Sequence, residues 1–216
     1  MAQVRQLTPK QEDRRHRILS AARELVADQG YEGMVMSQVA ERAGVSPTTL
    51  YNLYNTKDEL VLAALRDLLV ENTLKIEQES IGPGWKQIVR RVHNGGLQSQ
   101  SAPAYAEAIT HSLLRANPGD ALVEMLLTTL SQVYLESLIA MSERNEIKPG
   151  VDINELSASL VGVYWSSFML WNKGVIRLQE IDHRVEMNIL SMLFACTQGQ
   201  AHIDIETELE LVINRG

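Results

Sequence analysis

The stretch SQVAERAGVSPTTLYNLY, residues 37–54, contains two short helical patterns separated by a glycine. Gly44 ends the first pattern, because glycine enters the turn conformation needed there without a steric cost. Ser46 is a favourable N-cap and Pro47 is favoured at the first helical position, so a second helix is expected to begin there. Two short helices joined by a tight turn that contains glycine are typical of a helix-turn-helix motif.

The apolar and polar residues of this stretch fall on different faces. The residues expected to pack the two helices together are Ala40, Ala43, Val45, Leu50 and Leu53. The helical spacing then turns another set outward: Thr48, Thr49, Tyr51, Asn52 and Asn55. Hydroxyl groups, amides and a tyrosine can bond base edges and phosphates in the major groove of DNA. The alternative interpretation is a helical hairpin without a DNA role.

Helical periodicity continues on both sides of the motif, and no hairpin signal was found. A helix is expected over residues 12–29, with a stop at Gly30, and another over residues 57–79, with a break at residues 81–84. Further helices are expected near residues 85–99, 102–116, 119–146, 152–173 and 182–199. The pair Gly95-Gly96 leaves the end of the fifth helix open, and residues 204–216 are left unassigned. The expected fold class is all-α.

Composition excludes several classes of protein. With 216 residues, 45% of them hydrophobic and 22% charged, the chain is expected to be globular rather than disordered or fibrous. Cys196 is the only cysteine, which excludes an intramolecular disulfide and zinc sites built from several thiolates. The N-terminus lacks an apolar signal core, and the two longest uncharged stretches, residues 156–172 and 187–203, are short for a membrane span. A cytoplasmic protein without a membrane partner is therefore expected.

The net charge of −7 is unevenly distributed. Residues 1–60 carry 8 Lys and Arg against 8 Asp and Glu, so the whole acidic excess lies in the remainder of the chain. An acidic total therefore does not argue against DNA binding by the first part. The basic residues near the N-terminus either reach flanking phosphates or form a solvated face, because acidic residues interleave with them. They are Lys10, Arg14, Arg15 and Arg17.

Between Arg17 and Leu65 the sequence resembles the tetracycline-repressor (TetR) family of bacterial transcriptional regulators. The shared elements, in order, are IL.AA..L at 18–25, Gly30-Tyr31, VAERAGVS at 39–46, TLY at 49–51 and KDEL at 57–60. The resemblance covers the first third of the chain. It implies a helix-turn-helix DNA-binding domain over residues 11–71 and a helical effector-binding and dimerisation domain over residues 72–216.

The resemblance also implies roles for individual residues. By their position in the family motif, DNA is contacted by Pro47, Thr48, Thr49, Tyr51 and Asn52. Lys57 matches the basic residue that touches phosphate at the start of the fourth helix. The family usually has Thr or Ser where this chain has Val35, so the cap and its phosphate contact either pass to Ser37 or are missing. Thr48 and the pair Asn52-Leu53 also depart from the family pattern, which leaves the operator sequence undetermined.

Candidate sites in the second part are less specific. Residues that can line an apolar cavity are Trp85, Tyr105, Met125, Tyr134, Trp165, Phe168, Met169 and Trp171, although a residue of this kind is more often ordinary core. The two uncharged stretches predict helices with partners on several sides, as in a four-helix interface between two copies. Residues proposed for that interface are Ser159, Gly162, Leu190 and Leu193.

The expected function is that of a DNA-binding transcriptional regulator without a cofactor. A homodimeric repressor would bind a palindromic operator in double-stranded DNA and be released by a small, largely apolar effector. The alternative is a DNA-binding dimer whose second domain contacts another protein. An enzyme is not expected, because no metal-ligand, phosphate-loop or nucleophile spacing is found.

Overall fold

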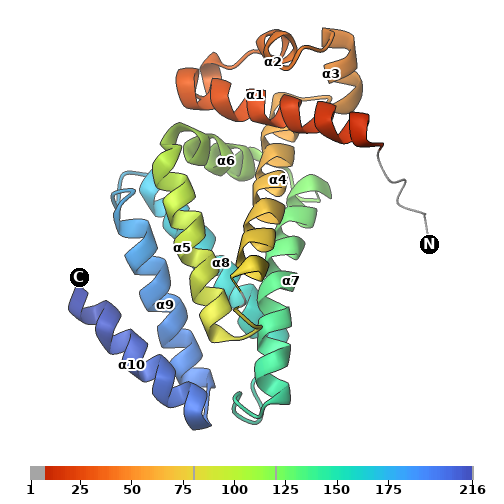
Figure 1. Ribbon diagram of the computed structural model, residues 1–216. Coiled ribbons are helices and arrows are strands. Elements are labelled where there is room, and N and C mark those ends of the chain that lie inside the picture. The colour runs from red at the N-terminus through yellow and green to blue at the C-terminus, as the bar shows by residue number, and fades with distance from the viewer. Residues whose placement is uncertain (1–7, 80, 120, 216) are drawn as a thin grey trace. The chain divides into compact units, whose positions relative to one another are not determined.

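The computed structural model describes residues 8–79, 81–119 and 121–215, and over these residues the chain forms ten α-helices (Figure 1). Their bounds are α1 (Pro9–Gly33), α2 (Met36–Ala43), α3 (Pro47–Leu53), α4 (Lys57–Gln78), α5 (Trp85–Ser101), α6 (Pro103–Arg115), α7 (Ala121–Glu143), α8 (Ile153–Asn172), α9 (Glu180–Cys196) and α10 (Gly199–Arg215). The all-α prediction is confirmed. No helix in these ranges is both long and apolar enough to cross a membrane.

Helix α1 begins earlier than the sequence analysis predicted. Thr8 is its N-cap: the Thr8 hydroxyl accepts from the Gln11 amide at 3.3 Å, and the Gln11 side chain accepts from the Thr8 amide at 2.8 Å. This reciprocal pair is a capping box, and Pro9 follows at the first helical position. Gly30 has φ 72° and ψ 172°, so the predicted break there is confirmed within the longer segment.

The first of two compact units contains the described residues up to Leu68 together with residues 102–118. Helices α1, α2 and α3 lie close together (Figure 1), and α6 packs along α1. The Tyr105 hydroxyl of α6 donates to the Val61 carbonyl of α4 at 3.0 Å. Packing therefore groups α6 with the helix-turn-helix, although the sequence analysis assigned residues 102–116 to the second domain.

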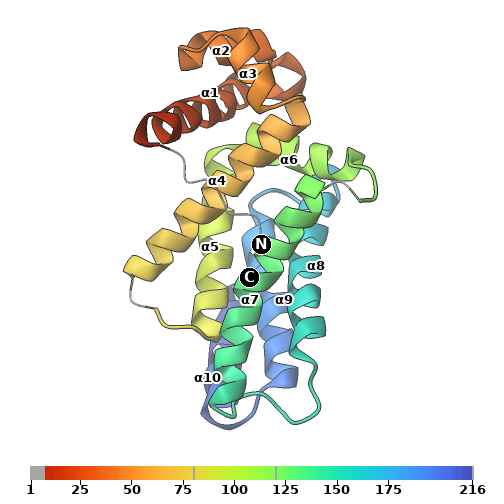
Figure 2. The same ribbon diagram turned by 90° about the vertical axis from the view of Figure 1, so that its right-hand side faces the viewer.

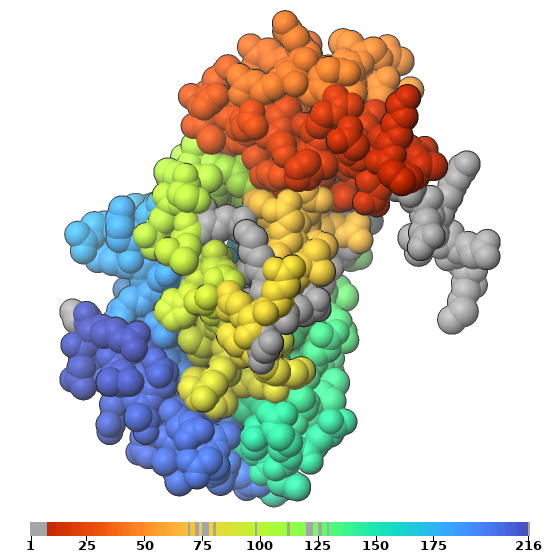
Figure 3. Space-filling model, in the orientation of Figure 1, coloured from red at the N-terminus to blue at the C-terminus, as the bar shows by residue number. Residues whose placement is uncertain are grey.

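The second unit contains residues 69–101 and the described residues from 119 onward. Helices α5, α7, α8 and α9 lie side by side (Figure 2), and α10 lies against α9 (Figure 3). Gly95 and Gly96 are inside α5, so they do not end it. The unassigned tail is helical, and it starts at Gly199, which has φ 65°. The connection that follows α7 and the connection that follows α9 meet in an isolated β-bridge between Ile147 and Thr197.

Candidate nucleic-acid interface

The turn between α2 and α3 has a defined backbone geometry. Gly44 adopts φ 65° and ψ 40°, and the Val45 amide donates to the Ala40 carbonyl at 2.9 Å. This bond closes the last turn of α2 in the manner of a Schellman cap. Arg17 of α1 donates from Nη1 to the Ala43 carbonyl, while its Nε pairs with Asp13 at 3.1 Å. The turn is thus held both by its own backbone and by a side chain from α1.

Helix α3 begins as the sequence predicted. The Ser46 hydroxyl accepts from the Thr49 amide at 3.1 Å and lies 2.8 Å from the Thr49 hydroxyl, and Pro47 occupies the first helical position. Pro47, Thr48, Tyr51 and Asn52 are exposed, whereas Thr49 is half-buried. The predicted DNA-facing residues therefore lie at the surface of α3, and their contact with DNA stays a prediction.

The prediction that Leu53 packs inward is wrong. Its residue surface is 43% exposed, whereas Tyr54 is 9% exposed. Leu50 is fully buried. Tyr54, four residues after Leu50, continues the buried face, whereas Leu53, three residues after it, does not. Burial raises the pKa of Tyr54, although the nearby Arg15 guanidinium opposes that shift. Tyr54 therefore supplies the core contact assigned to Leu53.

The start of α2 lacks a side-chain cap. Val35 is exposed at the N-cap position and makes no capping hydrogen bond, as its aliphatic side chain requires. Ser37 is exposed in the first turn. Its hydroxyl lies at the positive end of the helix, where a phosphate oxygen is favoured. The passing of the phosphate contact from Val35 to Ser37 remains a prediction.

Lys57, at the start of α4, lies against Tyr31 of α1. Its Nζ is 4.3 Å from the centre of the Tyr31 ring and donates to the Glu32 carbonyl at 3.4 Å. Burial is the main cause that lowers the Lys57 pKa. Arg115 of α6 approaches the same ring, with its guanidinium carbon 4.7 Å from the ring centre. No local sequence pattern points to Arg115, because it contacts a residue more than 80 positions earlier in the chain.

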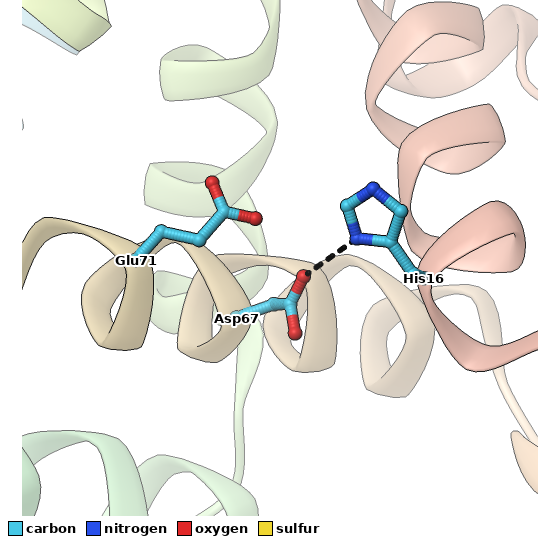
Figure 4. A group of neighbouring side chains, drawn as sticks. All are labelled: His16, Asp67 and Glu71. Carbon is cyan, nitrogen blue, oxygen red and sulfur yellow. Dashed lines mark ion pairs between the residues drawn. The ribbon is translucent and has the colours of Figure 1, made fainter. Parts of the chain in front are cut away.

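A charged cluster connects α1 with α4. The Asp67 carboxylate is 3.1 Å from Arg15, 3.4 Å from Arg23 and 4.0 Å from the His16 ring. Figure 4 shows Asp67 facing His16, with Glu71 one turn further along α4. Two guanidinium groups already compensate the negative charge of this carboxylate, so they oppose the binding of a metal cation there. Arg15 and Arg17 thus make contacts within the protein, and the absence of a metal stays a prediction.

The structure separates the predicted ligand-lining residues. Tyr134 and Phe168 are buried in the second unit, Trp85, Trp165 and Trp171 are half-buried, and Met169 is exposed. Tyr105 belongs to the first unit, where its hydroxyl bonds Val61, so it does not line a site in the second unit. The side chain of Met125 lies outside the described residues.

The residues proposed for the dimer interface also divide into two groups. Ser159 and Gly162 are exposed on α8, as a contact with a second copy requires. Leu190 and Leu193 are fully buried within the protomer. These two leucines point into the second unit because they continue the apolar stripe of α9 that packs on its neighbours. The structure therefore places them in the core and not at the surface.

Comparison with known proteins connects the motif to a family. The family model described as bacterial regulatory proteins, tetR family, matches residues 18–64. FasR, a transcriptional activator of Mycolicibacterium smegmatis, is 44% identical over 55 residues, which cover 26% of this chain and 25% of FasR. The chain thus spans about a quarter of the length of this relative. KstR, a transcriptional repressor of Rhodococcus jostii, is 24% identical over 188 residues, which cover 85% of this chain and 84% of KstR.

The fold is shared over most of the chain. The crystal structure of Thermus thermophilus FadR, a TetR-family transcriptional repressor in complex with lauroyl-CoA, has a TM-score of 0.69 at 18% identity. It covers 83% of this chain and 93% of FadR. The family match confirms the prediction of a regulator rather than an enzyme. Residues 18–64 therefore carry the helix-turn-helix DNA-binding domain of the TetR family of bacterial transcriptional regulators.

Proposed function

We propose that this protein is a homodimeric repressor that binds a palindromic operator in double-stranded DNA and is released by a small, largely apolar effector. The observation that carries the proposal is the exposed polar face of α3, presented next to a turn that Gly44 and Arg17 hold in place. Two copies would present their α3 helices to half-sites about 34 to 36 Å apart, one turn of DNA. Acting on DNA, the protein would work in the cytoplasm.

We assign DNA binding to residues 11–71 and effector binding with dimerisation to residues 72–216, within which residues 102–118 pack with the first unit. KstR is named a repressor, and the FadR structure holds lauroyl-CoA, so proteins of this fold can combine DNA binding with an effector that has an apolar chain. An effector that favours a conformation with poorly spaced α3 helices would lower operator affinity. Such coupling is typically about 1 to 3 kcal/mol, or about 5- to 150-fold in affinity.

The test is selection of bound duplexes from a random DNA pool by the purified protein at fixed salt. A palindrome with half-sites one turn apart is expected. Tyr51→Ala should then abolish binding to the selected operator while the variant stays folded by circular dichroism, since Tyr51 is 50% exposed and lies outside the buried core. Glu206→Ala, an exposed residue of α10, is the matched control and should bind as the wild type does.

Two outcomes would contradict the proposal. Unchanged operator affinity in Tyr51→Ala would remove α3 from the recognition surface. Salt-sensitive binding without any selected sequence would contradict a specific operator, and it would favour the alternative in which the second domain contacts another protein. Effectors are screened afterwards by release of the selected operator, starting with acyl-CoA thioesters of different chain length.

A further inference from the structure

A cluster of aromatic and charged side chains lies where α1, α4 and α6 come together within the first unit. The Tyr31 ring has two cations near its centre, Lys57 Nζ at 4.3 Å and the Arg115 guanidinium carbon at 4.7 Å. The Tyr31 hydroxyl donates to Asp58 Oδ1 at 2.7 Å, which fixes the ring relative to the start of α4. Each cation is attracted to the negative face of the ring, so the ring holds the Lys57 ammonium and the Arg115 guanidinium close together.

Two carboxylates lie beside these cations. Arg115 is 3.6 Å from Glu32 Oε1 and 3.7 Å from Asp58 Oδ1. Without Arg115, both negative charges would lie next to Lys57 with only the Lys57 ammonium to compensate them. Charges this close interact well within the screening length of about 8 Å at physiological salt. Arg115 is the residue from α6 that neutralises them.

We propose that Arg115 is a positioning residue for DNA binding, which acts through Lys57 by neutralising Glu32 and Asp58. The proposal rests on the phosphate contact assigned to Lys57. With Arg115 in place, the two carboxylates neither hold the Lys57 ammonium nor repel the phosphate that it approaches. We assign no DNA contact to Arg115 itself, because its guanidinium lies against the ring and the two carboxylates.

The first experiment measures operator affinity of Arg115→Met against salt concentration. Methionine keeps an unbranched apolar side chain and removes the charge. Affinity should fall about three- to tenfold at physiological salt, the size expected from two nearby charges left uncompensated in water. The slope of log affinity against log salt should stay unchanged, because the number of phosphate contacts is unchanged. Arg115→Lys keeps the charge and should retain most of the affinity.

The second experiment removes the charge that Arg115 neutralises. Glu32→Gln in the Arg115→Met background should restore most of the affinity, since the Glu32 side chain is 86% exposed and has no core role. In a Lys57→Ala background, Arg115→Met should have little further effect, because Arg115 acts through Lys57. Arg177→Met is the matched control: its side chain is 80% exposed and pairs with Glu180 in the second unit. This control should bind as the wild type does.

Three results would overturn the proposal. A salt slope lower by about one would mean that Arg115 contacts phosphate directly. A loss of affinity that Glu32→Gln does not restore, with a lowered unfolding temperature, would mean a merely structural role. Unchanged affinity in Arg115→Met would remove any role. Wild-type protein without a selected operator would contradict the proposed function itself, which is established before any variant is compared.

Discussion

Gly44 carries the backbone conformation on which the helix-turn-helix depends. Its φ of 65° lies in the left-handed region, which costs an L-residue with a Cβ about 1 to 2 kcal/mol. A Cβ at this position would also lie 3.2 Å from Arg17 Nη1, the group that donates to the Ala43 carbonyl. The turn, and through it the direction of α3, therefore depends on the absence of one methyl group.

We expect Gly44→Ala to lower the free energy of unfolding by about 1 to 2 kcal/mol, because alanine is strained in this conformation. Urea unfolding followed by circular dichroism measures the change. Gly82→Ala is the control, since Gly82 has no positive φ and a Cβ there would meet nothing within 4 Å. An equal effect of both substitutions would show that the conformation of Gly44 is not what the turn requires.

At the scale of secondary-structure elements, α5 and α9 meet through a buried polar cluster. A Cβ at Gly96 of α5 would lie 1.8 Å from Asp182 Oδ1 of α9, so the carboxylate packs directly on the α5 backbone. That oxygen is buried without a hydrogen-bond partner among the described residues. His93 lies 3.0 Å from Glu186 and 4.0 Å from Asp182. Glycine in α5 thus permits a close approach that places an incompletely satisfied carboxylate between two helices.

Burial raises the pKa of Asp182 to about 6, although the neighbouring His93 opposes the shift. Because this carboxyl group binds its proton more tightly in the folded state, its contribution to stability is present below its unfolded pKa of 3.8 and is lost as pH rises through about 6. The bond to Glu186 raises the pKa of His93, so His93 likewise contributes less at high pH. The α5–α9 contact should therefore weaken as pH rises.

The prediction is that Asp182→Asn stabilises the protein relative to the wild type at pH 7.5 but not at pH 4. The difference is expected to be about 1 to 3 kcal/mol, since one pKa unit corresponds to about 1.4 kcal/mol and solvent attenuates part of it. Urea unfolding of both proteins across this pH range measures it, and the comparison cancels the titrating groups that do not interact with Asp182. A difference that does not grow with pH would contradict the raised pKa of Asp182.

At the scale of the whole molecule, the proposed dimer depends on the outer face of α8. Beyond Glu155 in the first turn, its exposed residues at helical spacing are Ser159, Gly162, Ser166 and Met169, none of them charged. A Cβ at Gly162 would meet nothing within 4 Å, so the protomer itself does not require glycine there. An uncharged exposed face of this kind is suited to contact with a second copy across a twofold axis.

Gly162→Arg should convert a dimer into a monomer, because it would place a charge in the centre of a buried interface without a partner. Light scattering after size-exclusion chromatography measures the mass, and operator affinity should fall with it because a monomer binds one half-site. Thr207→Arg, on the exposed face of α10, is the control and should leave the mass unchanged. A Gly162→Arg protein that remains a dimer would place the interface elsewhere.

The sequence by itself determined the all-α class and the helix-turn-helix. The signals act on the backbone within four residues of themselves, so their effect does not depend on contacts with distant segments. They are Gly30, Gly44 and the pair Ser46-Pro47. The capping box at Thr8 is equally local and could have been predicted. The family motif between residues 18 and 64 depends on the same short-range pattern.

Only the tertiary structure decided which faces of these helices are buried and which helices belong together. It turned Leu53 outward and Tyr54 inward, and buried Leu190 and Leu193 within the protomer. It also placed α6 against α1, where Arg115 meets Tyr31 across more than 80 intervening residues. Apolar periodicity shows that a helix has a buried face but not what covers it, because the covering partner is chosen by packing between segments distant in sequence.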